Sequence, residues 1–188
     1  MADKNRLGVL LFLASEAIFF LILILSFIYF RGSWITASGP NPANQLHLLT
    51  TGLFSIALIS SSGTAWVAER SSKNGNQALT RLALAITIIL GAIFLVGQGR
   101  EYAQLLRSNI TISQNLFGTT FFTLTGFHGF HVLVGLAIWT ILLGLTLASS
   151  SDAPGANAVG AIALYWHFVD IVWVFIFSIV YIWTFLLL

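Results

Sequence analysis

Two short aromatic segments carry the polar side chains of this sequence that are best suited to chemistry: Gly126–His131 (GFHGFH) and Tyr165–Asp170 (YWHFVD). His128 and His131 are three residues apart, and so are His167 and Asp170, which puts each pair on nearly one face of a helix. Both segments lie inside long apolar runs, where a charged group costs roughly 2.5–3.5 kcal/mol on insertion scales. These four residues are therefore expected to have partners or a task.

Three roles fit these side chains. Imidazoles from two helices can ligate a haem or a metal ion, and a histidine that donates to an aspartate is an arrangement also found behind metal ligands. Histidines and acids can instead relay protons. In the third role they react with nothing, and hydrogen-bond between helices or contact lipid headgroups. The spacing favours this third role and leaves the other two open, because nothing in it requires a metal.

Two acids, Glu16 and Glu101, complete the set of candidate residues. Glu16 lies about ten residues inside the first apolar segment, roughly 14 Å along a helix and therefore near the middle of a bilayer. No lysine or arginine shares that interior, so we expect the Glu16 carboxyl group to be protonated or hydrogen-bonded to a neighbouring helix, with a proton or lipid role as the alternative. Glu101 lies next to Arg100 at a segment end, where a helix cap or a surface ion pair is expected.

The composition is that of a membrane protein. The 188 residues are 57% hydrophobic and 7% charged, with a mean hydropathy of +0.93, whereas about 25% of a soluble domain is charged. The eight basic residues are scattered over loops and form no patch for nucleic acid. The sequence has no cysteine, which excludes disulfides, thiolate metal sites and iron–sulfur ligation by this chain.

Five apolar segments are long enough to cross a bilayer as helices, since about 20 apolar residues suffice. They cover about residues 7–30, 46–68, 82–106, 116–148 and 158–187. Their apolar runs are continuous, which predicts an all-α bundle of five transmembrane helices rather than the alternating pattern of barrel strands. The last two segments are roughly 30 residues long and should tilt or project beyond the hydrocarbon. Because no internal repeat is present, residues 1–188 are predicted to form a single transmembrane domain.

The loops and their charges predict an orientation. Turn-forming residues at 38–42 and 149–155 separate the first segment from the second and the fourth from the fifth. The basic residues divide five against three between the two sides: Lys4, Arg6, Arg70, Lys73 and Arg81 against Arg31, Arg100 and Arg107. Because positive residues favour the cytoplasmic side, the N-terminus is predicted to be cytoplasmic and the C-terminus periplasmic or extracellular.

Small and aromatic residues predict how the helices pack. The serine-rich stretch at 60–64 has the small residues that allow helices to approach closely and to hydrogen-bond across, so it is predicted to be packing surface. Tryptophan and tyrosine side chains near segment ends are predicted to be interfacial anchors. They are Trp34, Trp66, Tyr102 and Trp183.

Motifs in all five segments, in order, resemble one family. They are GVLLFLASEAIFF at 8–20, SSSGT at 60–64, REY at 100–102, FFTLTGFHGFHVLVG at 121–135 and YWHFVDIVW at 165–173. Together they resemble subunit III of the haem–copper oxidases, in the five-helix form of bacterial cytochrome c oxidases. The two histidine-containing motifs are the specific ones, since the serine-rich stretch alone would be weak support.

The resemblance implies a non-catalytic structural subunit of a proton-pumping terminal oxidase of aerobic respiratory electron transport. In this family the haems and copper belong to subunits I and II, and the complex reduces oxygen to water with electrons from cytochrome c. Subunit III packs mainly beside subunit I, holds phospholipid in a cleft between helices and supports proton uptake. The chain is thus expected to bind phospholipid but no cofactor, metal or nucleic acid, in the plasma membrane of a bacterium.

The resemblance also implies roles for the candidate residues. Glu16 is similar to the family's buried acid in the first helix after the cleft, and Glu101 to its edge acid. The remaining four resemble polar contacts of the helix bundle rather than metal ligands: His128, His131, His167 and Asp170. Seven-helix members have two further N-terminal helices that form one wall of the lipid cleft, so a neighbouring subunit or bulk lipid is expected to supply that wall here.

Three alternatives to this role remain. The same fold can serve as subunit III of a quinol oxidase, since the electron-donor site lies on other subunits. A related accessory protein accompanies nitric oxide reductases. A stand-alone haem-binding or transport protein would instead need bis-imidazole ligation from His128 or His131 together with His167.

Overall fold

The structure, a computed structural model, describes residues 2–35, 46–113, 115–148 and 156–186. Its elements, in chain order, are α1 (Ala2–Ile35), α2 (Leu48–Lys73), α3 (Gln77–Arg107), α4 (Leu116–Ala148), α5 (Ala156–Phe177), the π-helix η2 (Ser178–Trp183) and α6 (Thr184–Leu186). Five stretches are long and apolar enough to cross a membrane, the last of them formed by α5, η2 and α6 together. This confirms the all-α, five-helix prediction. The turns predicted at 38–42 and 149–155 lie outside the described residues.

The helix ends extend beyond the apolar segments where polar residues continue or cap the helix. The apolar run predicts an end of α2 near residue 68, but α2 continues to Lys73, whose ammonium group pairs with Glu69 one turn earlier at 2.5 Å. α3 begins earlier than predicted because Asn76 caps it, accepting the backbone N–H of Leu79 at 3.1 Å. Gly75 has a φ of +73° and makes the tight turn between the two helices.

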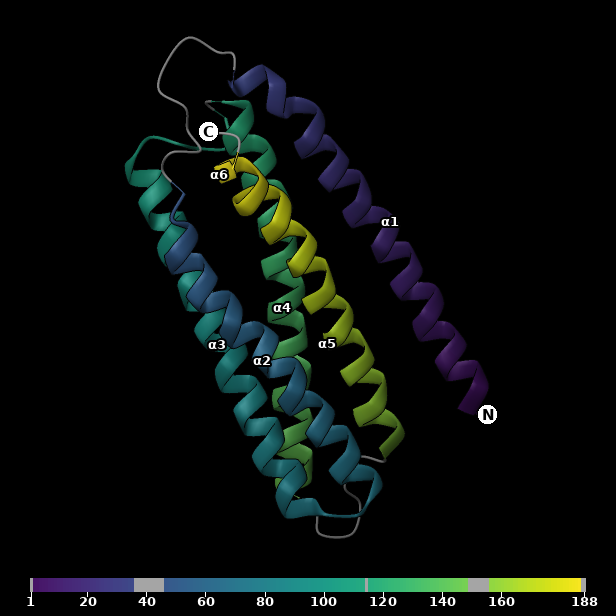
Figure 1. Ribbon diagram of the computed structural model, residues 1–188. Helices are drawn as coiled ribbons and strands as arrows, with labels where there is room; N and C mark the ends of the chain where they lie inside the picture. Colours follow the sequence, from purple (N-terminus) through teal and green to yellow (C-terminus); the bar gives the residue numbers. More distant parts are fainter. Residues whose placement is uncertain (1, 36–45, 114, 149–155, 187–188) are drawn as a thin grey trace.

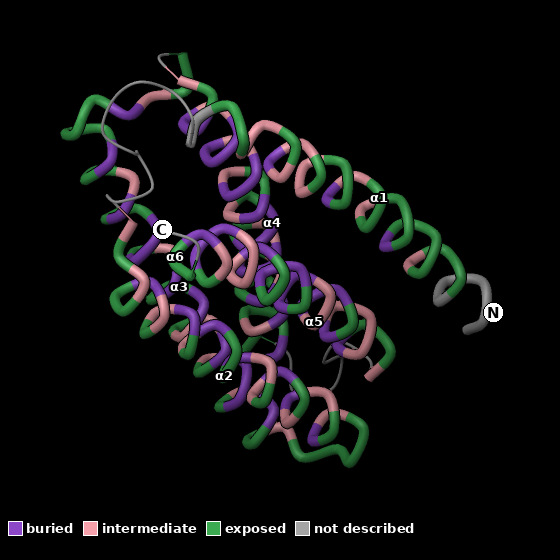
Figure 2. Tube along the Cα trace, turned by 45° about the horizontal axis from the view of Figure 1, so that its top comes forward, coloured by how far each residue is buried: buried purple, intermediate pink, exposed green. Residues whose placement is uncertain are grey.

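Four helices form the bundle and the first helix leans on its outside. α2 and α3 form an antiparallel hairpin, α4 packs against α3, and α5 packs against both α2 and α4 (Figure 1). α1 contacts α4 and α5, and its N-terminal end diverges from the other helices in both views (Figures 1 and 2). Much of α1 is exposed, whereas buried residues line the inner faces of the other four (Figure 2). α1 is therefore the helix best placed to meet lipid or another chain.

Trp166 of α5 joins four helices at the centre of the bundle. Its side chain is fully buried, and its indole N–H donates to Ser61 Oγ of α2 at 2.8 Å. Two glycines make room for the ring: a Cβ atom added to Gly91 of α3 would lie 3.0 Å from it, and one added to Gly135 of α4 only 2.5 Å. Small residues thus let a large aromatic side chain fill the middle of the bundle. Such close packing matters in a bilayer, where the hydrophobic effect does not drive helices together.

The predicted aromatic anchors have different outcomes. Trp66 is 55% exposed near the end of α2, where an anchor is expected. Tyr102 instead lies half-buried between α3 and α4, with its hydroxyl 2.7 Å from Thr125 Oγ1. The side chain of Trp34 lies outside the described residues.

Candidate functional site

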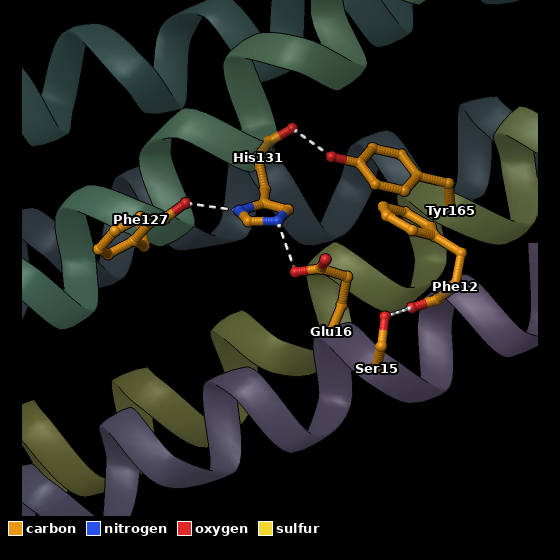
Figure 3. A network of polar contacts seen from close by, with 6 residues as sticks. All are labelled: Phe12, Ser15, Glu16, Phe127, His131 and Tyr165. Atoms are coloured by element: carbon orange, nitrogen blue, oxygen red, sulfur yellow. Dashed lines mark hydrogen bonds and ion pairs between the residues drawn. The ribbon is translucent and has the colours of Figure 1, made fainter.

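The acid of α1 and the second histidine of α4 meet in the structure. Glu16 Oε2 lies 3.1 Å from His131 Nε2, and His131 Nδ1 lies 2.7 Å from the carbonyl oxygen of Phe127, one turn earlier on the same helix (Figure 3). Tyr165 of α5 donates its hydroxyl to the carbonyl oxygen of His131 at 2.9 Å (Figure 3). Two residues that the sequence presents as separate candidates therefore form one site where three helices meet.

The hydrogen bonds of His131 determine how many protons the pair holds. A carbonyl oxygen can only accept, so Nδ1 carries a hydrogen and donates it to Phe127. Nε2 of a neutral ring is then an acceptor, which requires a protonated Glu16. An imidazolium ring would instead donate to a Glu16 carboxylate. In both forms one proton lies between Nε2 and Oε2 and the pair has zero net charge, which reduces the cost of placing it in the membrane.

An apolar cavity of about 670 Å³ lies beside this pair. Aliphatic and aromatic side chains of α1, α4 and α5 form most of its wall, and Glu16, His131 and Tyr165 contribute the main polar groups. Phe12 and Phe130 line it and are 49% and 59% exposed, so the cavity is open on one side. A long apolar molecule such as an acyl chain fits this lining, because the wall offers few hydrogen-bonding groups away from the pair.

The first histidine of the motif, His128, has different surroundings. Its ring is fully buried and stacks on Trp173 of α5, with ring centroids 4.8 Å apart, while Phe94 of α3 meets it edge-on at 5.9 Å. Neither ring nitrogen has a hydrogen-bond partner among the described residues. A proton chain through His128 would need such a partner, so the packing makes His128 a member of the aromatic core.

A serine of α2 lies between His167 and Asp170. Ser62 Oγ is 3.0 Å from His167 Nδ1 and donates to Asp170 Oδ2. The predicted contact between the histidine and the acid is thus mediated by Ser62 rather than direct. A hydroxyl has only one hydrogen, so when Ser62 donates to Asp170 the ring nitrogen must donate to Ser62. This three-residue group connects α2 to α5, and Asp170 is only 5% exposed there.

Glu101 joins α3 to the start of α2 and to the end of the fifth span. Its Oε2 accepts the hydroxyl of Tyr181 at 2.6 Å and its Oε1 the hydroxyl of Thr51 at 3.1 Å. A carboxylate at a helix N-terminus meets free N–H groups and the positive end of the helix dipole. Glu101 is 8% exposed and is therefore a buried contact between helices rather than a surface residue.

The π-helix η2 brings Tyr181 to this acid. A π-helix adds a residue to the turn, which rotates the side chains that follow it relative to those before it. Before η2, the indole of Trp173 donates to Ser55 Oγ of α2 at 2.9 Å. Within η2, Tyr181 also faces the α2–α3 hairpin, and its hydroxyl reaches Glu101 of α3.

The surroundings of His128, His131 and His167 do not suit a haem or metal site. The ring of His131 is hydrogen-bonded on both nitrogens, His167 is held by Ser62, and His128 is enclosed by aromatic rings. Within residues 2–35, 46–113, 115–148 and 156–186, no three His, Cys, Asp or Glu side chains are placed to hold a metal ion. The geometry therefore does not fit bis-imidazole ligation by these side chains.

The hydroxyl groups of the second segment were predicted to hydrogen-bond between helices, but the sequence did not specify their partners. Hydroxyls of α2 at 51, 55, 61 and 62 all bond residues of α3 or of the fifth span. Residues 51, 55 and 62 are separated by four and seven residues, which places them on one side of a helix, and Ser61 is next to that side; this signal is present in the sequence. That signal identifies a polar face, and only the fold shows which residues lie opposite to it.

Comparison with known proteins connects this arrangement to one family. The family model described as "Cytochrome c oxidase subunit III" matches residues 2–185. A Corynebacterium diphtheriae protein named "Cytochrome c oxidase subunit 3" is 38% identical over 176 residues, which cover 93% of this chain and 85% of the relative. Proteins of the same name from Synechocystis sp. and Oryctolagus cuniculus are 39% and 37% identical, over 95% of this chain and 76% and 69% of theirs.

Proposed function

The chain belongs to the cytochrome c oxidase subunit III family, and from this premise we propose that it is the non-catalytic, lipid-binding structural subunit of a proton-pumping haem–copper terminal oxidase. The observation that carries the lipid-binding part is the cavity of about 670 Å³, which is apolar, open on one side and bordered by the Glu16–His131 pair. An acyl chain of a phospholipid fits that space. The redox chemistry takes place in other subunits, and this chain binds phospholipid beside them.

The chain forms a single transmembrane domain and is part of a larger complex. Subunit I is the main partner and subunit II the second, in the plasma membrane of a bacterium, with the N-terminus cytoplasmic. The five-to-three division of basic residues supports this orientation. The names of the relatives favour cytochrome c over quinol as the electron donor, and they favour an oxidase over a nitric oxide reductase.

Purification of the chain from its native membrane in mild detergent tests the proposal. We expect it to bring down a large haem-containing subunit, a copper-binding subunit and phospholipid, identified by mass spectrometry and by a reduced-minus-oxidised optical spectrum. Haem bands and a copper-binding partner would distinguish a cytochrome c oxidase from a quinol oxidase. A chain that purifies alone with its own haem, or with a nitric oxide reductase, would refute the proposal.

Replacement of Glu16 by glutamine is expected to leave assembly intact and to impair sustained proton pumping. The amide can still donate a hydrogen bond to His131 Nε2, but it cannot give up or take up the proton that the pair shares. We expect the complex to inactivate severalfold sooner during continuous turnover, measured with an oxygen electrode and a pH probe on reconstituted vesicles. Glu69→Gln, an acid that pairs with Lys73 at a helix end, is the matched control. Wild-type pumping and lifetime in Glu16→Gln would contradict the role of the shared proton.

A further inference from the structure

Two nitrogens of the Arg31 guanidinium are buried without a hydrogen-bond partner. Arg31 lies near the end of α1, and neither Nε nor Nη2 bonds any group in the part of the chain that the structure describes. Its Cζ lies 4.4 Å from the ring centroid of Trp183 in η2. A guanidinium is always charged, and buried donors in proteins are normally paired. The site therefore holds a positive charge and two donors for which the described residues supply no acceptor.

The two free nitrogens form a single edge of the group. In the planar guanidinium, the Nε–H and one Nη2–H point in parallel, at the spacing of two oxygens of one oxyanion. Trp183 covers a face of the plane by a cation–π contact, which stabilises the charge but accepts no N–H in the plane. The edge thus has the geometry for a bidentate anion and no acceptor among the described residues.

The position of the edge selects the kind of anion. The apolar span of α1 ends at Ser33, two residues after Arg31, so the guanidinium lies at the level where a bilayer changes from hydrocarbon to headgroups. The aromatic residues two positions from Arg31 and from Trp183 in the sequence are exposed: Tyr29 is 79% exposed and Phe185 is 62% exposed. An anion at this depth with hydrocarbon beside it is the phosphodiester of a phospholipid. A carboxylate from another protein could accept the same two hydrogen bonds, but it has no acyl chain to cover the exposed aromatic side chains.

We propose that Arg31 and Trp183 form a binding site for the phosphodiester group of a phospholipid. The inference rests on the lipid-binding function proposed above, but the site is a different one. The α1 residues that line the cavity run from Val9 to Phe19, and Arg31 is about 18 Å further along the helix. The two sites hold different parts of a lipid, a chain in the cavity and a headgroup at Arg31.

Native mass spectrometry of the purified complex, titrated with phosphatidylglycerol, tests this site. We expect Arg31→Gln to bind one phosphatidylglycerol fewer than the wild type, or to bind it about tenfold more weakly. Arg31→Lys keeps the charge and loses the planar fork, so it should fall in between. The control is Arg70→Gln, because Arg70 also lies over a tryptophan, Trp66, at 5.8 Å but is exposed. Diacylglycerol with the same chains should bind wild type and Arg31→Gln equally.

Three outcomes would overturn the proposal. The first is equal phosphatidylglycerol binding by the wild type and Arg31→Gln. The second is one-for-one displacement of the lipid by inorganic phosphate, which would make this a site for a free anion. The third is loss of a neighbouring subunit in Arg31→Gln with unchanged lipid binding, which would assign the edge to a carboxylate of a protein.

The failure of this site is distinguishable from failure of the proposed function. A wild-type complex that retains no phospholipid of any kind would refute the lipid-binding function itself. A wild type that retains phospholipid, none of it dependent on Arg31, would refute only this site. If Arg31→Gln fails to assemble, as its thermal midpoint and subunit content would show, the comparison of wild type with Arg31→Lys decides the question.

Discussion

Replacement of Gly135 by alanine is expected to destabilise the helix bundle by about 1–3 kcal/mol, the usual cost of forcing an extra methyl group into a packed core. The new Cβ would lie 2.5 Å from the ring of Trp166. That indole cannot easily move aside, because it is fully buried, fixed by its hydrogen bond to Ser61, and also packed against Gly91. The clash therefore forces α4 and α5 apart.

Gly144 on the same helix provides a control of opposite sign. A Cβ added there meets nothing within 4 Å, and alanine is favoured over glycine in a helix by roughly 1 kcal/mol. Gly144→Ala should therefore be neutral or stabilising, while Gly135→Ala lowers the midpoint of thermal unfolding in detergent. Equal midpoints for the two variants would show that the Trp166 ring is not held as tightly as its contacts indicate.

Replacement of Glu101 by leucine is expected to be at least as damaging, because it removes a shared acceptor. The hydroxyls of Tyr181 and Thr51 would both lose their partner in a buried place, and each unsatisfied buried donor costs about 1–3 kcal/mol. We expect the fifth span to detach from the α2–α3 hairpin at this end, measured as faster proteolysis near the C-terminus and a lower midpoint of unfolding.

Glu101→Gln separates the acceptor from the charge. The amide oxygen accepts one hydroxyl and the amide nitrogen donates to the other, so this variant should lose less than half as much stability as the leucine variant. A second comparison is Tyr181→Phe, which removes one donor and leaves Glu101 bound to Thr51. If leucine and glutamine at 101 behave alike, the charge at the helix start matters more than the hydroxyl partners.

The helices were predictable from the sequence because the thickness of a bilayer sets the length of apolar sequence that a membrane-spanning helix needs. A continuous apolar run has to cross as a helix that satisfies its own backbone hydrogen bonds, and the bounds predicted for α4, 116–148, match the structure. The ends of α2 and α3 were less predictable, because Lys73 and Asn76 extend or cap those helices with polar contacts that hydropathy does not register.

The arrangement of the polar residues was not predictable, because it depends on contacts between distant segments. The i, i+3 spacing of His128 and His131 places both on one side of α4, yet a rotation of about 60° between them is enough to separate their roles. His128 meets Trp173 and His131 meets Glu16, 115 residues away in the chain. No pattern within a single helix specifies either partner, nor that Ser62 would stand between His167 and Asp170.

The pairing of Glu16 with His131 has a consequence for biosynthesis. The ribosome makes Glu16 115 residues before its partner, so α1 enters the bilayer when α4 has not yet been synthesised. During that interval the acid has no imidazole to share a proton with, and α1 crosses most cheaply with the proton on the carboxyl group. The arrival of α4 then gives this proton a second place to reside and attaches the outermost helix to the rest. Insertion and docking of α1 are thus two separate events, and a ribosome-stalled chain ending before residue 131 should hold α1 loosely.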